Sequence, residues 1–356
     1  MNLLTIVGAR PQFIKAAPVS QVLRRRHREL LVHTGQHYDA GMSEVFFTEL
    51  GLPQPQINLG IGSGSHGQQT GRMLMAIEDV LLAQRPDWVL VYGDTNSTLA
   101  AALAAVKLGV PVAHVEAGLR SFNRAMPEEH NRVLTDHCAD LLLCPTQTAV
   151  DLLAAEGLTA GVHLVGDVMV DALRQHAEVA RQRSGVLARL GLQPQGYLLA
   201  TIHRPYNTDQ PQNLGNIFDA FHDIHQLAGF PVVLPLHPRT GRRMQELGLA
   251  APAGVQVIEP VGYLDMLALE QAAAMILTDS GGIQKEAYTL AVPCITLRPE
   301  TEWVETVQAG WNVVVSADRD AIVQAALGRV WPAGPPPPVF GDGHAAERIV
   351  AVLERT

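Results

Sequence analysis

Short apolar runs alternate with stretches of helical period along the whole chain. Continuous apolar runs of about four to eight residues are typical of strands buried on both faces, whereas apolar residues spaced three and four apart mark one face of a helix. In the first half, this alternation predicts strands at residues 3–8, 29–34, 88–92, 112–115 and 141–144, and helices at residues 11–26, 68–83 and 98–108. Strand–helix–strand order of this kind predicts a parallel, doubly wound α/β sheet.

A second series with the same alternation follows, and it predicts a second Rossmann-like domain. Its strands are expected at residues 197–202, 232–236, 255–258, 274–278, 294–297 and 312–315. We place the domains at residues 1–168 and 169–340, followed by a last helix within residues 341–356. Parallel sheets carry their ligand sites at the carboxyl ends of their strands, so we expect the two domains to face a cleft lined by those ends.

Composition supports two buried cores and excludes several kinds of partner. The chain has 356 residues, of which 47% are hydrophobic, enough for two domains of ordinary size. A net charge of -9 argues against a nucleic-acid-binding protein. Because the chain shows neither a leader-like segment nor a long apolar run, we expect a cytoplasmic protein with no membrane partner. The three cysteines form no CxxC pair, so no disulfide framework is predicted.

Charged residues gather in one stretch, residues 113–132, which reads AHVEAGLRSFNRAMPEEHNR. Glu116 comes directly after a predicted strand, and Pro127 is a suitable first residue for the helix that follows. In that helix Glu128 and Arg132 share a face at a spacing of four. A solvated salt-bridge surface is one interpretation. The other is a set of carboxylates at a strand end that carries out acid/base chemistry.

Two further strand ends of the first domain carry charge. Arg10 and Lys15 lie at the start of the first predicted helix, where a helix N-terminus favours an anion. The alternative is an ordinary helix start with surface cations. Asp94 follows the strand at residues 88–92, and it is either a reactive carboxylate or the cap of the next helix.

The second domain ends three of its strands with groups suited to phosphate. His203 and Arg204 follow one strand, and His237 follows the next in a weaker version of the same pattern. The sequence Ser280-Gly281-Gly282 joins a third strand to a helix, and backbone N–H groups at such a turn bind phosphate. Glu286 lies one turn into that helix, within reach of ligand hydroxyls. A structural histidine and a tight turn that needs glycine are the alternative interpretations.

Motifs for other chemistries are missing from the sequence. The exit of the first strand, residues 8–15, carries neither GxGxxG nor a P-loop pattern, so neither a dinucleotide nor a Walker-type nucleotide site is predicted there. There is no HExxH, no EF-hand loop and no GxSxG, so we expect no metal ligands and no serine nucleophile. The predicted site therefore combines anion-binding groups with carboxylates.

The motifs, taken in order, resemble the non-hydrolysing UDP-N-acetylglucosamine 2-epimerases. The resemblance extends over residues 8–349 and is strongest to the branch that includes the 2-epimerases of UDP-2,3-diacetamido-glucuronate. It implies a glycosyltransferase-B-like fold in which the C-terminal helix packs on the first domain. It also implies a homodimeric isomerase without cofactor. The segments that carry it are GARPQFIKAAP, TGQHYD, YGDTNST, HVEAGLRS, MPEEHNR, HR, LTDSGGIQKEA, TEW and FGDGHAAERI.

Roles follow from the resemblance position by position. It implies that UDP leaves by elimination, that 2-acetamidoglucal is the intermediate, and that UDP-N-acetylglucosamine and UDP-N-acetylmannosamine interconvert. Arg132 and His237 complete the set of expected substrate contacts. The matched residues are Asp94, Glu116 and Glu128 as acid/base carboxylates, His203 as catalytic histidine, Arg10 and Lys15 as cationic contacts, Ser280, Gly281 and Gly282 as the diphosphate turn, and Glu286 as the ribose contact.

The sequence departs from the family pattern at several places. Pro205 and Tyr206 stand in a motif that many members read as HRxEN, and Trp303 stands where many have an arginine. Met266 replaces an aromatic residue expected near uracil. Residues 64–67 (GSHG) lack the Arg-Gln pair through which some members bind an activating UDP-sugar. A UDP-2,3-diacetamido-glucuronate 2-epimerase, a glycosyltransferase and a nucleotide-sugar-binding regulator without turnover are the alternative functions.

Overall fold

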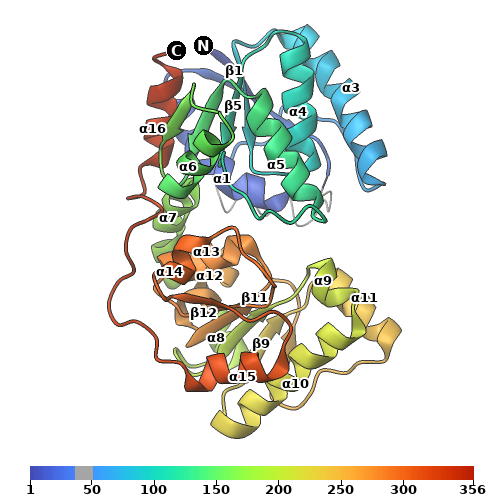
Figure 1. Ribbon diagram of the computed structural model, residues 1–356, viewed down its shortest axis with the longest axis vertical. Helices are drawn as coiled ribbons and strands as arrows, with labels where there is room; N and C mark the ends of the chain where they lie inside the picture. Colours follow the sequence, from blue (N-terminus) through green and yellow to red (C-terminus); the bar gives the residue numbers. More distant parts are fainter. Residues whose placement is uncertain (37–50) are drawn as a thin grey trace. The chain divides into compact units, whose positions relative to one another are not determined.

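The computed structural model describes residues 1–36 and 51–356 and divides into two compact units. Unit 1 comprises Met1–Arg174 and Val339–Thr356, and unit 2 comprises Gln175–Pro338 (Figure 1). His37 and Asp39 of the TGQHYD motif lie outside the described residues, and so does the side chain of Arg10. None of the helices in these ranges has both the length and the apolar character that a membrane span requires.

Unit 1 is built on a parallel sheet with helices on its faces, as the apolar pattern predicted. In the described residues the strand order is β3-β2-β1-β4-β5-β6-β7. The strands are β1 (Asn2–Val7), β2 (Arg28–His33), β3 (Ile57–Asn58), β4 (Trp88–Tyr92), β5 (Val112–Val115), β6 (Leu141–Cys144) and β7 (Val162–Leu164). The helices are α1 (Arg10–Leu23), α3 (His66–Gln84), α4 (Asn96–Lys107), α5 (Pro127–Cys138), α6 (Gln147–Ala155), α7 (Val168–Arg183), which continues into unit 2, and α16 (Ala345–Leu353).

Small side chains let α4 lie close to the sheet and to α3. Five alanines of α4 are buried in the core together with strand residues of β1 and β4 and with Met73 and Ile77 of α3. The helix begins at Asn96, and the side chain of Thr95 caps it by accepting a hydrogen bond from the Thr98 backbone N–H. Because Thr95 is the cap, the carboxylate of Asp94 is available for other partners.

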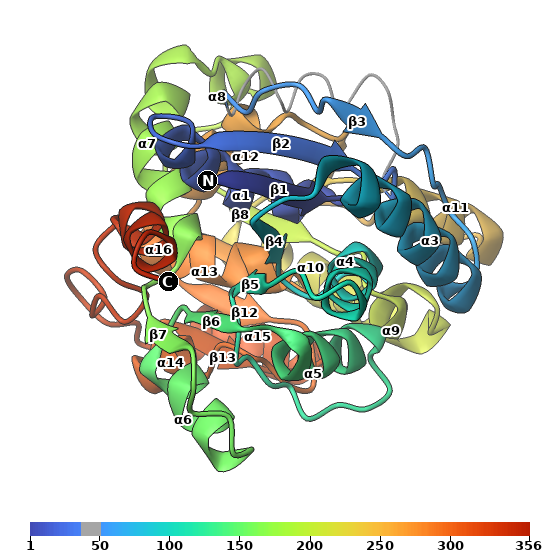
Figure 2. The same ribbon diagram turned by 90° about the horizontal axis from the view of Figure 1, so that it is seen from above.

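The C-terminal helix α16 packs against α1, so the end of the chain completes unit 1 (Figure 1, Figure 2). The carboxylate of Asp171 on α7 accepts hydrogen bonds from the backbone N–H groups of Ala345 and Ala346, at 3.1 and 2.8 Å. These are two of the N–H groups that a helix start leaves without an intrahelical acceptor. Asp171 therefore fastens the first turn of α16.

Unit 2 repeats the architecture with the strand order β10-β9-β8-β11-β12-β13 in its described residues. Every strand pair is parallel, and aliphatic residues of α10 and α15 cover the sheet. The strands are β8 (Leu198–Thr201), β9 (Val232–Pro235), β10 (Val255–Ile258), β11 (Met275–Thr278), β12 (Cys294–Thr296) and β13 (Asn312–Val314). The helices are α8 (Val186–Leu190), α9 (Pro205–Thr208), α10 (Pro211–Ala228), α11 (Pro238–Leu247), α12 (Tyr263–Ala272), α13 (Gly281–Thr289), α14 (Val304–Gln308) and α15 (Arg319–Gly328).

Candidate active site

Glu116 sits at the carboxyl end of β5 in a strained conformation. Its φ is 73°, in the left-handed region that side chains other than glycine seldom adopt. Strain of this kind often marks a functional position. Its carboxylate forms an ion pair with the ammonium group of Lys15 on α1, and both side chains are largely buried. The fold therefore brings together two residues that the sequence placed at different strand ends.

Gly93 makes room for this pair. It follows β4, has a φ of 63°, and a Cβ built on it would lie 3.3 Å from both Glu116 Oε2 and Lys15 Nζ. A side chain at this position would meet both the backbone strain and the ion pair. The glycine of the YGDTNST motif is thus explained by how closely the residues after β1, β4 and β5 approach one another at the carboxyl ends of these adjacent strands.

Asp94 is held by the first two turns of α5. Its carboxylate forms an ion pair with Arg132, and the backbone carbonyl accepts a hydrogen bond of 3.0 Å from Asn131 Nδ2. Arg132 is also 3.2 Å from the carboxylate of Glu129. The helix begins at Pro127 as predicted, and Glu128, in its first turn, is partly buried. Arg132 thus joins the Asp94 loop to the helix that carries Glu128.

Glu129 has a structural task that the sequence did not reveal. Its carboxylate accepts hydrogen bonds from the backbone N–H groups of Ser121 and Phe122, at 2.9 and 2.8 Å, and from the Ser121 hydroxyl at 2.8 Å. These bonds fix the loop between β5 and α5, where Phe122 adopts a φ of 58°. The Glu129 carboxylate is therefore committed to holding its own loop.

A chain of buried amides extends from Asn131 to two further helices. Asn131 donates to Asn96 Oδ1 at 3.1 Å, and Asn96 donates to Gln69 Oε1 at 2.8 Å. These residues come from α5, α4 and α3. The sequence predicts a role for none of these three amides. Their position near predicted helix starts, where polar residues gather, was the signal available.

Asp279 joins two strand ends of unit 2. Its fully buried carboxylate accepts hydrogen bonds from the backbone N–H groups of His203 and Arg204 and from Asn207 Nδ2, at 3.0–3.1 Å. It also lies 3.3 Å from His203 Nδ1. Burial lowers the pKa of His203; Asp279 opposes this shift, and Arg204 reinforces it. Asp279 directly follows the strand expected at residues 274–278, but the sequence predicts no role for it.

The Ser280-Gly281-Gly282 turn begins α13, and Ser280 occupies the N-cap position. The Ser280 backbone N–H donates to Thr278 Oγ1 at 2.9 Å. A Cβ on Gly281 would lie 2.3 Å from Glu302 Oε1, whereas one on Gly282 would meet nothing closer than 3.8 Å. Glycine is therefore required at position 281 by close packing, and the helix start has the geometry that favours an anion.

Glu302 and Trp303 pack beside this turn. Glu302 is paired with Arg298 at 2.9 Å, and both side chains are buried. The Lys285 ammonium lies 4.0 Å from the centroid of the Trp303 ring. Trp303, which stands where many family members have an arginine, is thus a buried partner of a lysine.

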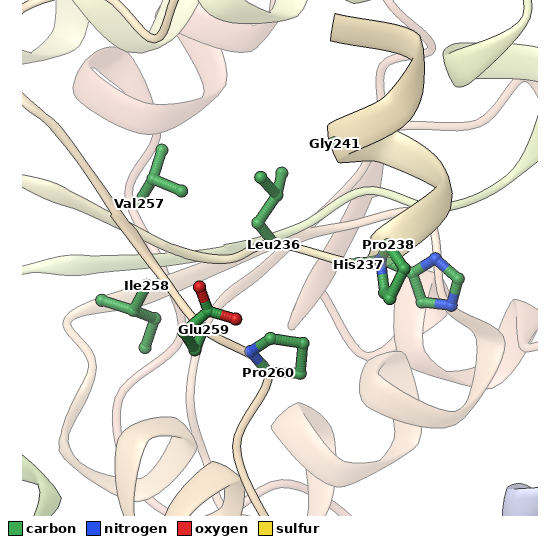
Figure 3. A pocket seen from close by; sticks show the side chains of 8 residues that line it. All are labelled: Leu236, His237, Pro238, Gly241, Val257, Ile258, Glu259 and Pro260. Atoms are coloured by element: carbon green, nitrogen blue, oxygen red, sulfur yellow. The ribbon is translucent and has the colours of Figure 1, made fainter. Parts of the chain in front are cut away.

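A cavity of about 400 Å³ lies between the ends of β9 and β10 in unit 2. Leu236, His237 and Pro238 line it on the β9 side, and residues 257–260 line it on the β10 side (Figure 3). The His237 ring centroid is 5.7 Å from that of His203. His237 Nδ1 also accepts a hydrogen bond of 3.2 Å from the Arg239 backbone N–H, which caps α11.

In the described part of the chain, no group of three histidine, cysteine or acidic side chains is arranged to hold a metal ion. Among the residues expected to bind ligand in unit 2, Glu286 of α13 is buried, His203 is partly buried and His237 is exposed. The two units each collect polar groups at the carboxyl edge of their own sheet. Unit 1 supplies mainly carboxylates and their cations, and unit 2 supplies a histidine pair and a glycine-rich helix start.

Comparisons with known proteins agree with these features. Residues 21–354 match the model of the UDP-N-acetylglucosamine 2-epimerase family. The UDP-2,3-diacetamido-2,3-dideoxy-D-glucuronate 2-epimerase of Pseudomonas aeruginosa is 52% identical over 364 residues, which cover 100% of both chains. The crystal structure of the Methanocaldococcus jannaschii UDP-GlcNAc 2-epimerase in complex with UDP-GlcNAc and UDP has a TM-score of 0.95 and 44% identity, with full coverage of both chains.

A more distant structure supports the fold alone. The glycotransferase of kitacinnamycin has a TM-score of 0.54 and 14% identity, over 99% of this chain and 94% of that one. The likeness agrees with the two parallel-sheet domains that the alternation of strands and helices predicted. The resemblance of the motifs is confirmed, and the chain belongs to the UDP-N-acetylglucosamine 2-epimerase family.

Proposed function

We propose that the protein is an isomerase that interconverts UDP-N-acetylglucosamine and UDP-N-acetylmannosamine. The observation that carries the proposal is the pair of ion-paired carboxylates, Asp94 and Glu116, at the ends of the adjacent strands β4 and β5 in a chain of this family. Two faces of a sugar ring require two differently placed acid/base groups, and a site with several carboxylates supplies them.

The reaction proceeds by elimination because the C2 hydrogen is not adjacent to a carbonyl group. A carboxylate takes the C2 proton, the C–H electron pair forms the C1–C2 double bond, and the C1–O electrons leave with UDP. The intermediate is 2-acetamidoglucal. A carboxylic acid then protonates C2 from the opposite face, and a β-phosphate oxygen of UDP adds back to C1. Charge that develops on the departing diphosphate must be stabilised by groups already in position.

The two units divide these tasks. Asp94, Glu116 and Glu128 act on the sugar, and Lys15 and Arg132 compensate the charge of two of these carboxylates. The backbone N–H groups at the start of α13 bind the diphosphate, and His203 assists the departure and return of UDP. Arg10 and His237 make further substrate contacts, and Glu286 binds the ribose. With domain boundaries at residues 168 and 340, the first domain would act on the sugar and the second would bind UDP.

A second substrate is favoured by a specific observation. The Pseudomonas aeruginosa relative named for UDP-2,3-diacetamido-2,3-dideoxy-D-glucuronate shares 52% of its residues with this chain, more than the 44% shared with the Methanocaldococcus jannaschii enzyme named for UDP-N-acetylglucosamine. The same elimination serves both sugars, because the C3 and C6 substituents take no part in it. Substrate choice therefore depends on groups around C3 and C6.

The test is a comparison of kcat/KM for the two UDP-sugars with the purified protein. A preference of tenfold, about 1.4 kcal/mol of transition-state discrimination, identifies the native substrate. Turnover of either sugar supports an epimerase, whereas turnover of neither contradicts the proposal. We also propose that the enzyme works in the cytoplasm as a homodimer without cofactor. Light scattering of the active protein tests the dimer. Full activity after treatment with chelator, together with no organic cofactor released on denaturation, tests the absence of a cofactor.

A further inference from the structure

His114 is a fully buried histidine of β5 for which the reaction above has no role. Its Nε2 lies 2.7 Å from the backbone carbonyl oxygen of Gly93. Its Nδ1 lies 2.7 Å from Oδ1 of Asp136 on α5, 22 residues further along the chain. Both ring nitrogens therefore face an oxygen at hydrogen-bond distance, which a neutral imidazole with one N–H can satisfy only in part.

The partners decide where the protons are. A carbonyl oxygen only accepts, so Nε2 must carry a hydrogen. The other oxygen of Asp136 accepts from the backbone N–H of Gly118 at 3.1 Å and from the Arg120 guanidinium at 2.6 Å. A guanidinium and a backbone N–H that donate to the same oxygen favour the ionised carboxylate. An ionised Asp136 can only accept, so Nδ1 carries a hydrogen as well.

Arg120 and Asp136 are the charged groups buried beside the ring. Arg120 forms a bidentate pair with Glu156, at 2.6 and 2.8 Å, in addition to its bond with Asp136. Burial raises the pKa of the neighbouring Cys144 thiol to about 12, so that group is neutral. The Glu156 side chain is reached by solvent, and His137 Nε2 also lies 3.2 Å from it. With a protonated ring, the buried carboxylate of Asp136 lies between two cations, and Glu156 meets the remaining positive charge.

Through hydrogen bonds to Gly93 and Asp136, and from Gly118 to Asp136, His114 is linked to every segment of unit 1 that carries a proposed catalytic carboxylate. Gly93 directly precedes Asp94, and Gly118 follows Glu116 by two residues. Asp136 belongs to α5, whose first turn carries Glu128. We infer that His114 is a buried imidazolium that positions the loops of Asp94 and Glu116. It is a positioning residue, and its effect on catalysis rests on the proposed function.

The protonation state is tested on the unaltered protein. We would label histidine with nitrogen-15, assign the His114 signals by their loss in His114→Asn, and look for one-bond N–H couplings at both ring nitrogens. Two coupled nitrogens at neutral pH are expected. A bare Nδ1 would overturn the inference, because the proton would then reside on Asp136 or be absent. This result does not depend on any activity, so it stands even if neither UDP-sugar is a substrate.

The positioning role is tested by kinetics of His114→Asn. We expect kcat to fall on the order of 10²-fold, as small displacements of catalytic groups do. The affinity for UDP should stay within about threefold, because the proposed nucleotide-binding groups belong to unit 2. His163→Asn, the same change in the edge strand β7 of the same sheet, serves as the matched control. A kcat for His114→Asn equal to that of the control would contradict the role.

A double variant separates lost charge balance from lost geometry. His114→Asn removes one of the two cations that contact the Asp136 carboxylate, and Asp136→Asn added to it removes the charge of the carboxylate as well. We expect the double variant to melt at a higher temperature than His114→Asn, with little recovery of kcat. Full recovery of kcat would show that charge balance alone matters and would overturn the positioning role. If His114→Asn does not fold, the His114 ring signals are assigned in the wild type by through-bond correlation to the backbone, and the nitrogen-15 measurement then decides the protonation state.

Discussion

Replacement of Glu116 by glutamine removes a charge and a proton acceptor while it keeps the size of the side chain. Loss of one acid/base group typically lowers the rate by about 10²–10⁴, or roughly 3–5 kcal/mol of transition-state stabilisation. The left-handed backbone at this position is unchanged in the variant, because glutamine has the same β-carbon. Any loss of activity therefore reports on the carboxylate and not on relief of strain.

The same substitution leaves the Lys15 ammonium without its counter-ion. The side chains of Lys15 and Glu116 are 13% and 6% exposed, so the pair lies between a surface ion pair and a fully buried one. An exposed pair contributes about 0–1 kcal/mol, and breaking a fully buried pair costs about 3–5 kcal/mol. We therefore expect Glu116→Gln to lower the free energy of unfolding by about 1–3 kcal/mol.

The double variant Lys15→Met/Glu116→Gln distinguishes the two effects. Removing the unpaired cation should restore most of the stability measured by urea denaturation, but it should not restore epimerisation. The assay follows C2 inversion by proton NMR together with release of UDP and 2-acetamidoglucal. If Glu116→Gln retains a rate within about threefold of wild type, or if the double variant regains activity, Glu116 has a structural role and the assignment is wrong.

Three further predictions follow from single contacts. Gly281→Ala should weaken UDP binding at least tenfold in calorimetry, because its methyl group would collide with Glu302, whereas Gly282→Ala should bind normally. Because burial lowers the pKa of His203, the unfolded chain binds more protons than the folded one just below pH 6.5. Acidification through that range should therefore destabilise wild type more than His203→Asn in urea titrations, and equal slopes would contradict this. Asp171→Ala removes both bonds to the first turn of α16 and should lower the free energy of unfolding by about 1–3 kcal/mol; an unchanged denaturation midpoint would argue that the turn is held by packing alone.

The apolar pattern predicted the two parallel sheets because their central strands are buried runs bounded by polar turns. It missed β3 and β7, which have two and three residues and lie at the edges of the unit 1 sheet. Edge strands this short carry no apolar run, and their pairing depends on the neighbouring strand. The start of α5 at Pro127 was predictable because proline favours the first helical position.

Partners within the site were harder to predict than the positions of its residues. Parallel strands place their carboxyl ends at one edge, so Asp94 and Glu116 could be expected near each other. The pairing of Arg132 with Asp94 and Glu129 depends on the rotation of α5, which the spacing of charges leaves open. The hydrogen bonds of Asp279 to backbone N–H groups have no signature in sequence, because every residue carries such a group.

Isotope exchange in D2O tests the elimination mechanism most directly. The wild-type protein would be incubated with a UDP-sugar that carries oxygen-18 in the bridge between C1 and the β-phosphate, using the better of the two candidate sugars. The account predicts that deuterium enters at C2 as the epimer forms and that oxygen-18 moves from the bridge to non-bridging positions of the β-phosphate. Deuterium at C2 with oxygen-18 retained entirely in the bridge, and with no free UDP or glycal, would contradict cleavage of the C1–O bond.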